Sequence, residues 1–349
     1  MLVDDSRVAL GVLKKMLATS TEIEVVGTAS DGKDALQQIP HLKPQVICTD
    51  LHMPKMDGLA LTREIMRIAP LPILAISISV QSDNNHNVFQ FLEAGAVDVF
   101  PKPRSGLDGN NRRLCRELTR KIKVLSGVVP IRRHSRKNRV LPTITTDNAL
   151  PKRDIAHKIG SRNIRLITIG ASTGGPQALA KIFSELPGNL PVPILCIQHI
   201  STGFLNEMVS WLDSHTPLNV EIAQHGRHPQ PGTIYFPPED RHLTLDDNGC
   251  FVSKHGNEAE HHIPAIDKTF FSVAKQFGAS AIGVLLTGMG RDGADGLHAM
   301  RNSGAHTIAQ DEETCVVFGM PNQAIQLGAA EKILPIQDVA DSLLRLLNT

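Results

Sequence analysis

The stretch 166–175 reads LITIGASTGG, in which an apolar run passes directly into a glycine-rich turn containing Ser172. Leucine and β-branched residues fill its first four positions, as in a buried strand. Apolar residues recur at helical spacing over 179–186, so the turn joins a strand to a helix. The glycines of this G-x-S-x-G pattern allow a sharp turn that exposes the serine hydroxyl above the sheet. The stretch therefore predicts an α/β domain with a serine nucleophile at its edge.

The same alternation of strands and helices extends in both directions from this turn. The second half has further strand patterns at 194–197 and 282–286, and helical patterns at 270–277 and 339–347. The first half has strand patterns at 23–26, 46–49, 73–77 and 97–100, and helical spacing over 8–17 and 59–68. Such alternation is typical of parallel sheets with helices on both faces. We therefore predict the α/β class, with two doubly wound parallel-sheet domains.

Composition divides the chain into two globular segments, 1–126 and 164–349, and a linker at 127–163. The chain has 349 residues, of which 41% are hydrophobic, enough for two cores. The linker is basic and lacks periodicity, which favours a solvated tether; contact with nucleic acid is the alternative. Lys and Arg (36) nearly balance Asp and Glu (35), giving a formal charge of +1. The whole-chain charge therefore offers no case for nucleic-acid or anionic-membrane partners.

Nothing in the sequence predicts export or insertion into a membrane. No apolar run approaches the roughly 18 residues of a spanning helix. Asp4 and Asp5 follow after only three residues, which is incompatible with a signal peptide. The five cysteines are scattered without a C-x-x-C pair, so we expect reduced thiols, with neither a disulfide framework nor a thiolate zinc site. These features predict a cytoplasmic protein.

Acidic residues of the first segment stand directly after strands. Asp4 and Asp5 follow the first strand, and Asp50 follows the strand at 46–49. Since parallel strands end at one edge of a sheet, these carboxylates would repel one another unless a hard cation such as Mg²⁺ lay among them. Ser77 and Lys102, at the ends of two further strands, would contact a phosphoryl group attacked by one carboxylate. This edge therefore predicts phosphoryl chemistry that depends on Mg²⁺.

With its flanking residues, this set resembles the receiver domain of two-component response regulators. The resemblance rests on V-D-D-S at 3–6, D-L-H-M-P-K-M-D-G at 50–58 and K-P at 102–103. It implies a flavodoxin-like fold, phosphorylation at Asp50, and Mg²⁺ held by Asp4, Asp5, Asp50 and the carbonyl of His52. Val99 stands where receivers usually carry an aromatic switch residue, and the few residues before Asp4 predict a short first strand.

A serine nucleophile needs a base, and the base needs a group that fixes its tautomer. His199 follows the strand at 194–197 after Gln198, and Asp292 follows the strand at 282–286 through a glycine-rich turn. Both therefore share the carboxyl edge of the sheet with Ser172. A phosphate-binding loop is the competing interpretation of the turn at 170–175, but the G-x-x-x-x-G-K pattern is absent. The order Ser, His, Asp differs from that of α/β-hydrolases, which predicts a convergent serine hydrolase.

These residues resemble the catalytic domain of chemotaxis protein-glutamate methylesterases, which also act as protein-glutamine deamidases. Further matches lie at 203–204 (GF), 231–235 (PGTIY), 266–267 (ID) and 315–321 (CVVFGMP). The resemblance implies a Rossmann-like α/β methylesterase domain in which Ser172 is the nucleophile, His199 the base and then acid, and Asp292 the group that orients it. Backbone N–H groups would form the oxyanion hole; our candidate is Met289, and Thr173 is a weaker one.

Two positions depart from the family pattern near the expected site. Glu239 replaces the usual glycine of its turn, and I-P-A at 263–265 stands where many relatives carry Arg-Pro-Ser. His261 or His262 could replace that arginine in contacting the substrate. Adjacent histidines without a third ligand are more typical of a solvated loop than of a metal site.

Together the two resemblances imply a response regulator whose output hydrolyses glutamate γ-methyl esters, and deamidates specific glutamines, on chemoreceptors. The expected partners are methyl-accepting chemoreceptors as substrates and a chemotaxis histidine kinase as phosphodonor. Mg²⁺ serves only the receiver, and the hydrolase needs no cofactor. The alternatives are an output that docks receptors without catalysis, a paralogue acting outside chemotaxis, and a regulator whose linker binds nucleic acid. No helix-turn-helix pattern follows the linker, which disfavours the last.

Overall fold

The computed structural model describes residues 1–77, 88–103, 109–128, 163–257, 260 and 262–348. The predicted linker at 127–163 lies almost wholly outside these residues, so its boundaries stay a prediction. None of the described helices combines the length and the apolar composition that crossing a bilayer requires.

Strands and helices alternate through the N-terminal half, which we define as β1 to α5. Its elements are β1 (Leu2–Val3), α1 (Arg7–Leu17), β2 (Thr28–Ala29), α2 (Gly32–Leu42), β3 (Ile47–Asp50), α3 (Gly58–Ile68), β4 (Ile73–Ser77), α4 (Gln90–Ala94), β5 (Asp98–Pro101) and α5 (Gly109–Leu125). The described strands pair in parallel in the order β2-β1-β3-β4-β5. This is the flavodoxin-like order, whose switch point lies between β1 and β3.

Successive side chains of each strand enter two different cores. On β4, Ile73 and Ala75 pack on the face covered by α2, α3 and α4, whereas Leu74 and Ile76 pack beneath α1 and α5. Because side chains alternate across a strand, near-continuous apolar strands such as this one are buried on both faces.

The C-terminal half, β6 to α11, repeats the alternation on a larger scale. Its elements are β6 (Leu166–Ala171), α6 (Gly175–Phe183), β7 (Ile194–Gln198), α7 (Leu205–Asp213), β8 (Asn219–Ile222), β9 (Thr233–Phe236), β10 (Arg241–Leu245), β11 (Phe251–His255), α8 (Ile266–Phe277), η1 (Gly278–Ser280), β12 (Ala281–Leu285), α9 (Ala294–Asn302), β13 (His306–Gln310), α10 (Met320–Gln326), β14 (Lys332–Leu334) and α11 (Ile336–Leu347). The parallel order of the described strands is β14-β13-β12-β6-β7-β9-β8. An antiparallel pair, β10 and β11, stands apart from this sheet.

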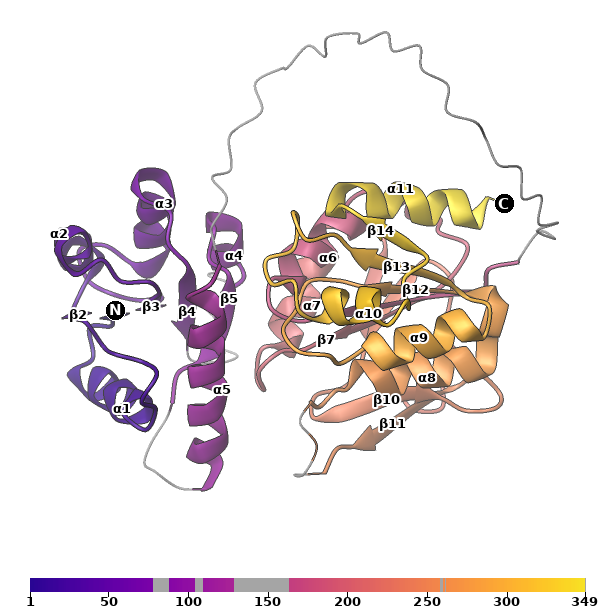
Figure 1. Cartoon of the computed structure of the whole chain (residues 1–349), viewed down its shortest axis with the longest axis horizontal. Coiled ribbons are helices and arrows are strands. Elements are labelled where there is room, and N and C mark those ends of the chain that lie inside the picture. The colour runs from indigo at the N-terminus through magenta and orange to yellow at the C-terminus, as the bar shows by residue number, and fades with distance from the viewer. Residues whose placement is uncertain (78–87, 104–108, 129–162, 258–259, 261, 349) are drawn as a thin grey trace, which may run out of the picture.

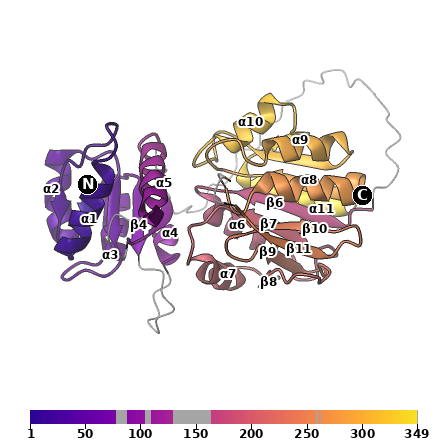
Figure 2. The ribbon, with the colours of Figure 1, turned by 90° about the horizontal axis from the view of Figure 1, so that it is seen from below.

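Helices cover both faces of the larger sheet, as Figure 2 shows. Helices α6, α7 and α11 pack on one face, and α8, α9 and α10 on the other. The prediction of two doubly wound parallel-sheet domains is therefore confirmed.

The strand predicted at 23–26 is wrong. Strand β1 pairs with Thr28 and Ala29, and the Leu2 N–H bonds to the carbonyl of Gly27, so the pairing begins after residues 23–26. Ile23 and Val25 still pack partly against the core beneath α1, which explains their apolar pattern. The pairing partner, and not the local sequence, decides which of these residues form a strand.

The two halves meet through α4, β5 and α5 of the first, which face the second in both views (Figures 1 and 2). Phe89, just before α4, stacks on Trp211 of α7 with ring centroids 5.4 Å apart. Both rings belong to one apolar cluster that continues into the cores of the two halves. The contact is therefore partly apolar, and polar groups surround it as described below.

Candidate active site

Ser172 follows the last residue of β6, the strand from which the sheet is wound in both directions. Strands β7 and β12 flank β6, and the crevice at such a switch point is the usual ligand site of an open α/β sheet. The Ser172 N–H donates to the carbonyl of Thr287, 3.0 Å away. Gly174 has a φ of +76°, and a Cβ there would collide with Val316. The turn is therefore shaped by glycine, as the sequence predicted.

His199 and Asp292 form a buried pair at the same edge. The His199 Nε2 lies 2.8 Å from Asp292 Oδ2, and their side chains are 12% and 8% exposed. Nδ1 of His199 is also buried and hydrogen-bonds to none of the described residues. The bond to Asp292 assigns the ring hydrogen to Nε2, which leaves Nδ1 as the nitrogen able to accept a proton. Within the described chain, no hydrogen bond joins Nδ1 to the Ser172 hydroxyl, a contact that often forms only with substrate.

The start of α8 holds the carboxylate of Asp292. The N–H of Ile266 donates to Oδ2 at 2.8 Å, and the N–H of Asp267 donates to Oδ1 at 3.0 Å. Burial alone would raise the pKa of Asp292, but the hydrogen bond and charge of His199, with these two N–H groups, lower it to about 2. Asp292 is therefore ionised at neutral pH and can stabilise an imidazolium at His199.

The turn after β12 brings Met289 beside the serine. A Cβ added to Gly288 would lie 2.6 Å from the Cβ of Ser172, so the two backbones approach too closely for any other residue. The carbonyl of Gly288 accepts the N–H groups of Gly319 and Met320. Among the described residues, the N–H of Met289 has no hydrogen-bond acceptor. This geometry is compatible with the oxyanion role predicted for Met289.

Three further side chains connect the turns that carry these residues. The Thr173 hydroxyl donates to Asp98 of β5 at 3.3 Å, and the Thr287 hydroxyl donates to the Thr173 carbonyl at 3.0 Å. Gln198, missed in the sequence, donates through Nε2 to the carbonyls of both Ser172 and His199 at 2.8 Å. Its place, directly before His199, was the only sequence signal for this role.

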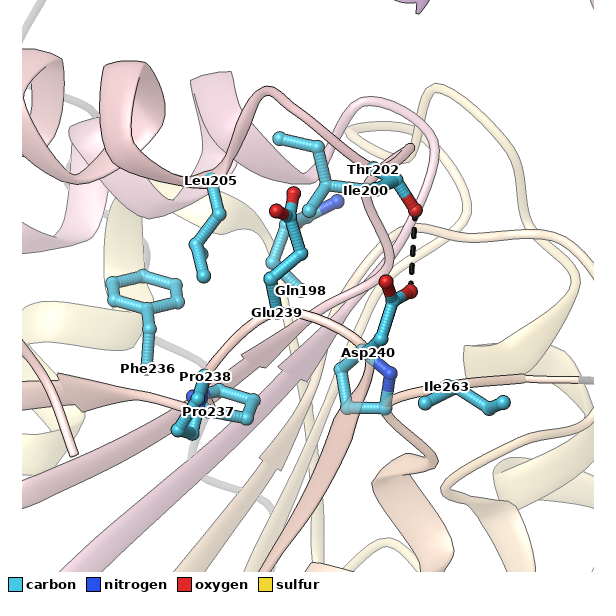
Figure 3. Close-up of a pocket in the computed structure, with 11 residues that line it drawn as sticks. Gln198, Ile200, Thr202, Leu205, Phe236, Pro237, Pro238, Glu239, Asp240 and Ile263 are labelled. Atoms are coloured by element: carbon cyan, nitrogen blue, oxygen red, sulfur yellow. Dashed lines mark hydrogen bonds between the residues drawn. The ribbon is translucent and has the colours of Figure 1, made fainter. Parts of the chain in front are cut away.

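A narrow pocket lies beside His199, between the end of β7 and the turn after β9. Figure 3 shows Thr202 and Asp240 joined by a hydrogen bond, with Phe236 and Ile263 on opposite sides of the view. The bond is 3.2 Å long, and all four residues line the pocket. Its cavity volume is about 20 Å³, room for about one water-sized group. Glu239 and Ile263, the two departures from the family pattern, both line this pocket. His261 lies outside the described residues.

The acidic residues predicted in the N-terminal half converge. Asp4, Asp5 and Asp50 each offer an oxygen within 4.8 Å of the others. Nζ of Lys102 lies 2.7 Å from Asp4 and 2.8 Å from Asp50. Carboxylates this close fit a hard divalent cation, which prefers oxygen ligands. Burial, together with the charge of Asp4, raises the pKa of Asp50 against the opposing effect of Lys102.

Ser77 and His52 complete the set predicted around Asp50. Ser77 is buried at the end of β4, next to β5 in the sheet, and its carbonyl accepts the Lys102 N–H at 2.7 Å. His52 follows Asp50 by two residues, and its side chain is exposed. All five strand-end residues of the prediction thus lie at one edge of the smaller sheet.

The N-terminal half contacts residues that flank the candidate triad. Asp98 of β5 bonds to Thr173, next to Ser172, and Arg120 of α5 approaches the Met289 sulfur at 3.4 Å. Glu117 of α5 accepts the hydroxyl of Ser201, 2.6 Å away and two residues past His199. Each of the loops bearing Ser172, His199 and Met289 is therefore touched by the other half of the chain.

Comparison with known proteins finds a family match in each half of the chain. The family model described as CheB methylesterase matches residues 167–343, and that of the response regulator receiver domain matches residues 1–108. A protein-glutamate methylesterase/protein-glutamine glutaminase of Syntrophus aciditrophicus is 39% identical over 346 residues, covering 99% of this chain and 97% of its own. A relative of the same description in Geobacter metallireducens is 36% identical, covering 98% and 97%.

A solved structure resembles the C-terminal half. It is the crystal structure of the Thermotoga maritima CheB methylesterase catalytic domain, which matches with a TM-score of 0.51 at 39% identity. The match covers 52% of this chain and 98% of that domain.

Proposed function

Since the chain belongs to the CheB methylesterase family and carries a response regulator receiver domain, we propose that Ser172, His199 and Asp292 catalyse its reaction under the control of phosphorylation at Asp50. The enzyme is a protein-glutamate methylesterase and protein-glutamine glutaminase. The observation that carries the residue assignment is the His199–Asp292 pair, which lies at the same sheet edge as Ser172.

Acylation begins when Oγ of Ser172 attacks the γ-carbonyl carbon of the esterified glutamate. Nδ1 of His199 takes the hydroxyl proton, and Asp292 stabilises the imidazolium that results. The N–H of Met289 donates to the oxyanion; one such donor is typically worth about 10²–10³ in rate. Collapse of the tetrahedral intermediate breaks the bond to the methoxy oxygen, which leaves as methanol with the proton from His199.

Deacylation repeats these steps with water as the nucleophile. His199 removes a proton from the water and returns it to Oγ of Ser172 as the bond between Oγ and the acyl carbon breaks, and the glutamate γ-carboxylate is released. With glutamine as substrate, the first step breaks the carbon–nitrogen bond and the leaving group is ammonia. The same groups therefore serve both reactions.

In the receiver, Asp4, Asp5, Asp50 and the His52 carbonyl would hold Mg²⁺, which neutralises charge on the phosphoryl group. The carboxylate of Asp50 attacks phosphorus as the bond from phosphorus to the histidine nitrogen of the phosphodonor breaks, and Lys102 and Ser77 would contact the oxygens of the aspartyl phosphate. The close approach of the three carboxylates supports this assignment.

Docking of the receiver on the catalytic half would restrain the enzyme. The contacts of Asp98, Arg120 and Glu117 with the loops around Ser172 support this idea, because they lie where a protein substrate must approach. An aspartyl phosphate carries about 1.5 to 2 negative charges in place of the single charge of the carboxylate, enough to shift a marginal interface between domains. Phosphorylation would then free the site.

The substrates we propose are the methyl-esterified cytoplasmic regions of chemoreceptors, and the phosphodonor is a chemotaxis histidine kinase. This places the enzyme in the cytoplasm. No part of the proposed chemistry requires nucleic acid or insertion into a membrane.

Methanol release from methyl-esterified receptor fragments tests the proposal. We compare the unmodified chain with Ser172→Ala and with the matched control Ser184→Ala, an exposed serine at the end of α6, each with and without acetyl phosphate and Mg²⁺. Release should require Ser172, persist in the control and rise with acetyl phosphate. Equal release by Ser172→Ala would refute the nucleophile; release indifferent to acetyl phosphate would refute the switch.

A further inference from the structure

A second histidine lies flat against the candidate base. The ring of His262 stacks on the ring of His199, with centroids 4.4 Å apart and planes inclined by only 4°. His262 lies on the loop between β11 and α8, far along the chain from β7. The mechanism above gives it no role.

The segment that carries His262 contacts both members of the His–Asp pair. Four and five residues after His262, the N–H groups of Ile266 and Asp267 hold the carboxylate of Asp292. One short segment therefore positions the carboxylate by hydrogen bonds and covers the imidazole with a ring.

Hydrogen bonds join this segment to His242 of β10. His242, only 3% exposed, accepts the Ala265 N–H at Nδ1 (3.1 Å) and bonds through Nε2 to Glu260, 2.6 Å away. Hydrogen bonds from Lys268 and, to a smaller extent, from His242 lower the pKa of Glu260 to about 2. Its carboxylate is therefore ionised at neutral pH. The loop is thus bonded to His242 on both sides of His262.

A ring held by one hydrogen bond keeps a rotational freedom that stacking can remove. The bond from Nε2 to Asp292 fixes one corner of the His199 ring but not its tilt about the side-chain axis. Parallel stacking on a fixed neighbour selects one ring plane. In that plane Nδ1 stays aimed at the same point throughout the reaction, as proton transfer demands.

We propose that His262 is a positioning residue that holds the His199 ring in the plane in which Nδ1 can take the proton of Ser172. The inference rests on the proposed function, in which His199 is the base. The planar ring of His262 does this, and its nitrogen atoms are not required. Its loss should therefore slow catalysis with little effect on substrate affinity.

The test replaces His262 by alanine, which removes the ring, and by phenylalanine, which retains a planar ring. His255→Ala, an exposed histidine of β11, is the matched control. Two rates are measured on the full chain: labelling of Ser172 by a fluorophosphonate, in which Oγ bonds to phosphorus and fluoride leaves, and methanol release. Thermal melting reports whether each variant is folded.

His262→Ala should lower the labelling rate and kcat about 5- to 10-fold, with KM within 2-fold of the unmodified chain. His262→Phe should restore both rates to within about 2-fold, and His255→Ala should match the unmodified chain. An alanine variant as fast as the unmodified chain, or a phenylalanine variant as slow as alanine, would overturn the inference. Fast labelling without methanol release would instead reject the proposed substrate, because labelling needs only an activated serine.

Discussion

The carboxylate of Asp292 accepts two backbone N–H groups besides the ring of His199. Asp292→Asn can keep the Asp267 N–H bond to Oδ1, but an amide nitrogen in place of Oδ2 accepts neither the Ile266 N–H nor the Nε2 hydrogen and so favours the wrong tautomer of His199. We expect kcat to fall about 10³- to 10⁴-fold. Methanol release measures this, with Asp295→Asn, an exposed carboxylate paired with Arg291, as the control. A loss below tenfold would contradict the assignment of Asp292.

The carboxyl group of Asp267 should make the free energy of unfolding depend on pH. Burial raises its pKa to about 6, although the Gly296 N–H bond opposes this. The folded state therefore binds a proton between about pH 4 and 6 that the unfolded state has released, so this group reduces stability as pH rises through that window. Asp267→Asn mimics the protonated form and should raise the free energy of unfolding by about 1–2 kcal/mol at pH 7.5 and by a smaller amount at pH 4.5, near the lower end of the window. Calorimetric melting at both pH values measures it; an equal gain at both would contradict the cause.

Residues that directly follow strands could be identified from the sequence, because parallel strands bring their carboxyl ends to one edge. This holds for Ser172, His199 and Asp50, each of which follows or ends an apolar run. His262 could not be found in this way. Its contact with His199 joins two residues that are far apart in the sequence, which no local pattern encodes. Gln198 carried a positional signal only.

At the scale of the elements, the turn between β12 and α9 sets the spacing around the serine. Gly288→Ala would bring a Cβ to 2.6 Å from the Cβ of Ser172 and to 2.5 Å from the sulfur of Met320. The turn must shift, and with it Met289, so kcat should fall at least about 10-fold. Kinetics of methanol release test this; an unchanged kcat would show that the approach of the two turns is not needed.

Gly11, inside α1, serves as a comparison for Gly288, because it has no close neighbour. A Cβ there would meet nothing within 4 Å. Gly11→Ala should therefore leave activity unchanged and raise stability by about 0.5–1 kcal/mol, since alanine loses less backbone entropy in a helix. Thermal melting of the receiver transition checks the gain, and a lower melting temperature would contradict it.

Helices and strands could be predicted where the hydrophobic periodicity was strong. They were harder to predict where pairing with a neighbouring strand decides whether a segment forms a strand. The strand at 73–77 was predicted with its observed bounds, because both of its faces are apolar. The strand predicted at 23–26 was wrong, because β1 pairs with Thr28 and Ala29 instead. The β10–β11 hairpin was not predicted, although the turn sequence DDNG at 246–249 between two apolar patterns was a readable signal.

At the scale of the whole molecule, Glu93 of α4 links the two halves. It accepts the Trp211 Nε1 hydrogen at 2.7 Å and lies 3.2 Å from Nε2 of His215. Glu93→Ala removes these contacts from the docked form alone, because the undocked indole is hydrated. Activity without phosphodonor should therefore rise about 2- to 5-fold. The control is Glu64→Ala, whose partner Arg67 lies on its own helix; an unchanged or lower basal rate would argue against restraint by docking.

The interface between the halves could not be read from the sequence. Its residues come from α4, β5 and α5 on one side and from helix α7 and separate loops on the other. Each taken alone resembles an ordinary surface residue, as Glu93 and Ser201 illustrate. Only the folded surfaces together define the contact.

Trp211 is the only tryptophan of the chain, and it stacks on Phe89 across the boundary between the halves. The fluorescence of Trp211 can therefore report on the contact between the two halves. Selective excitation of the indole collects light from this boundary alone, without any attached dye. A change in emission after mixing with acetyl phosphate would follow the separation of the halves in real time, and its absence in Asp50→Asn would tie the signal to the receiver.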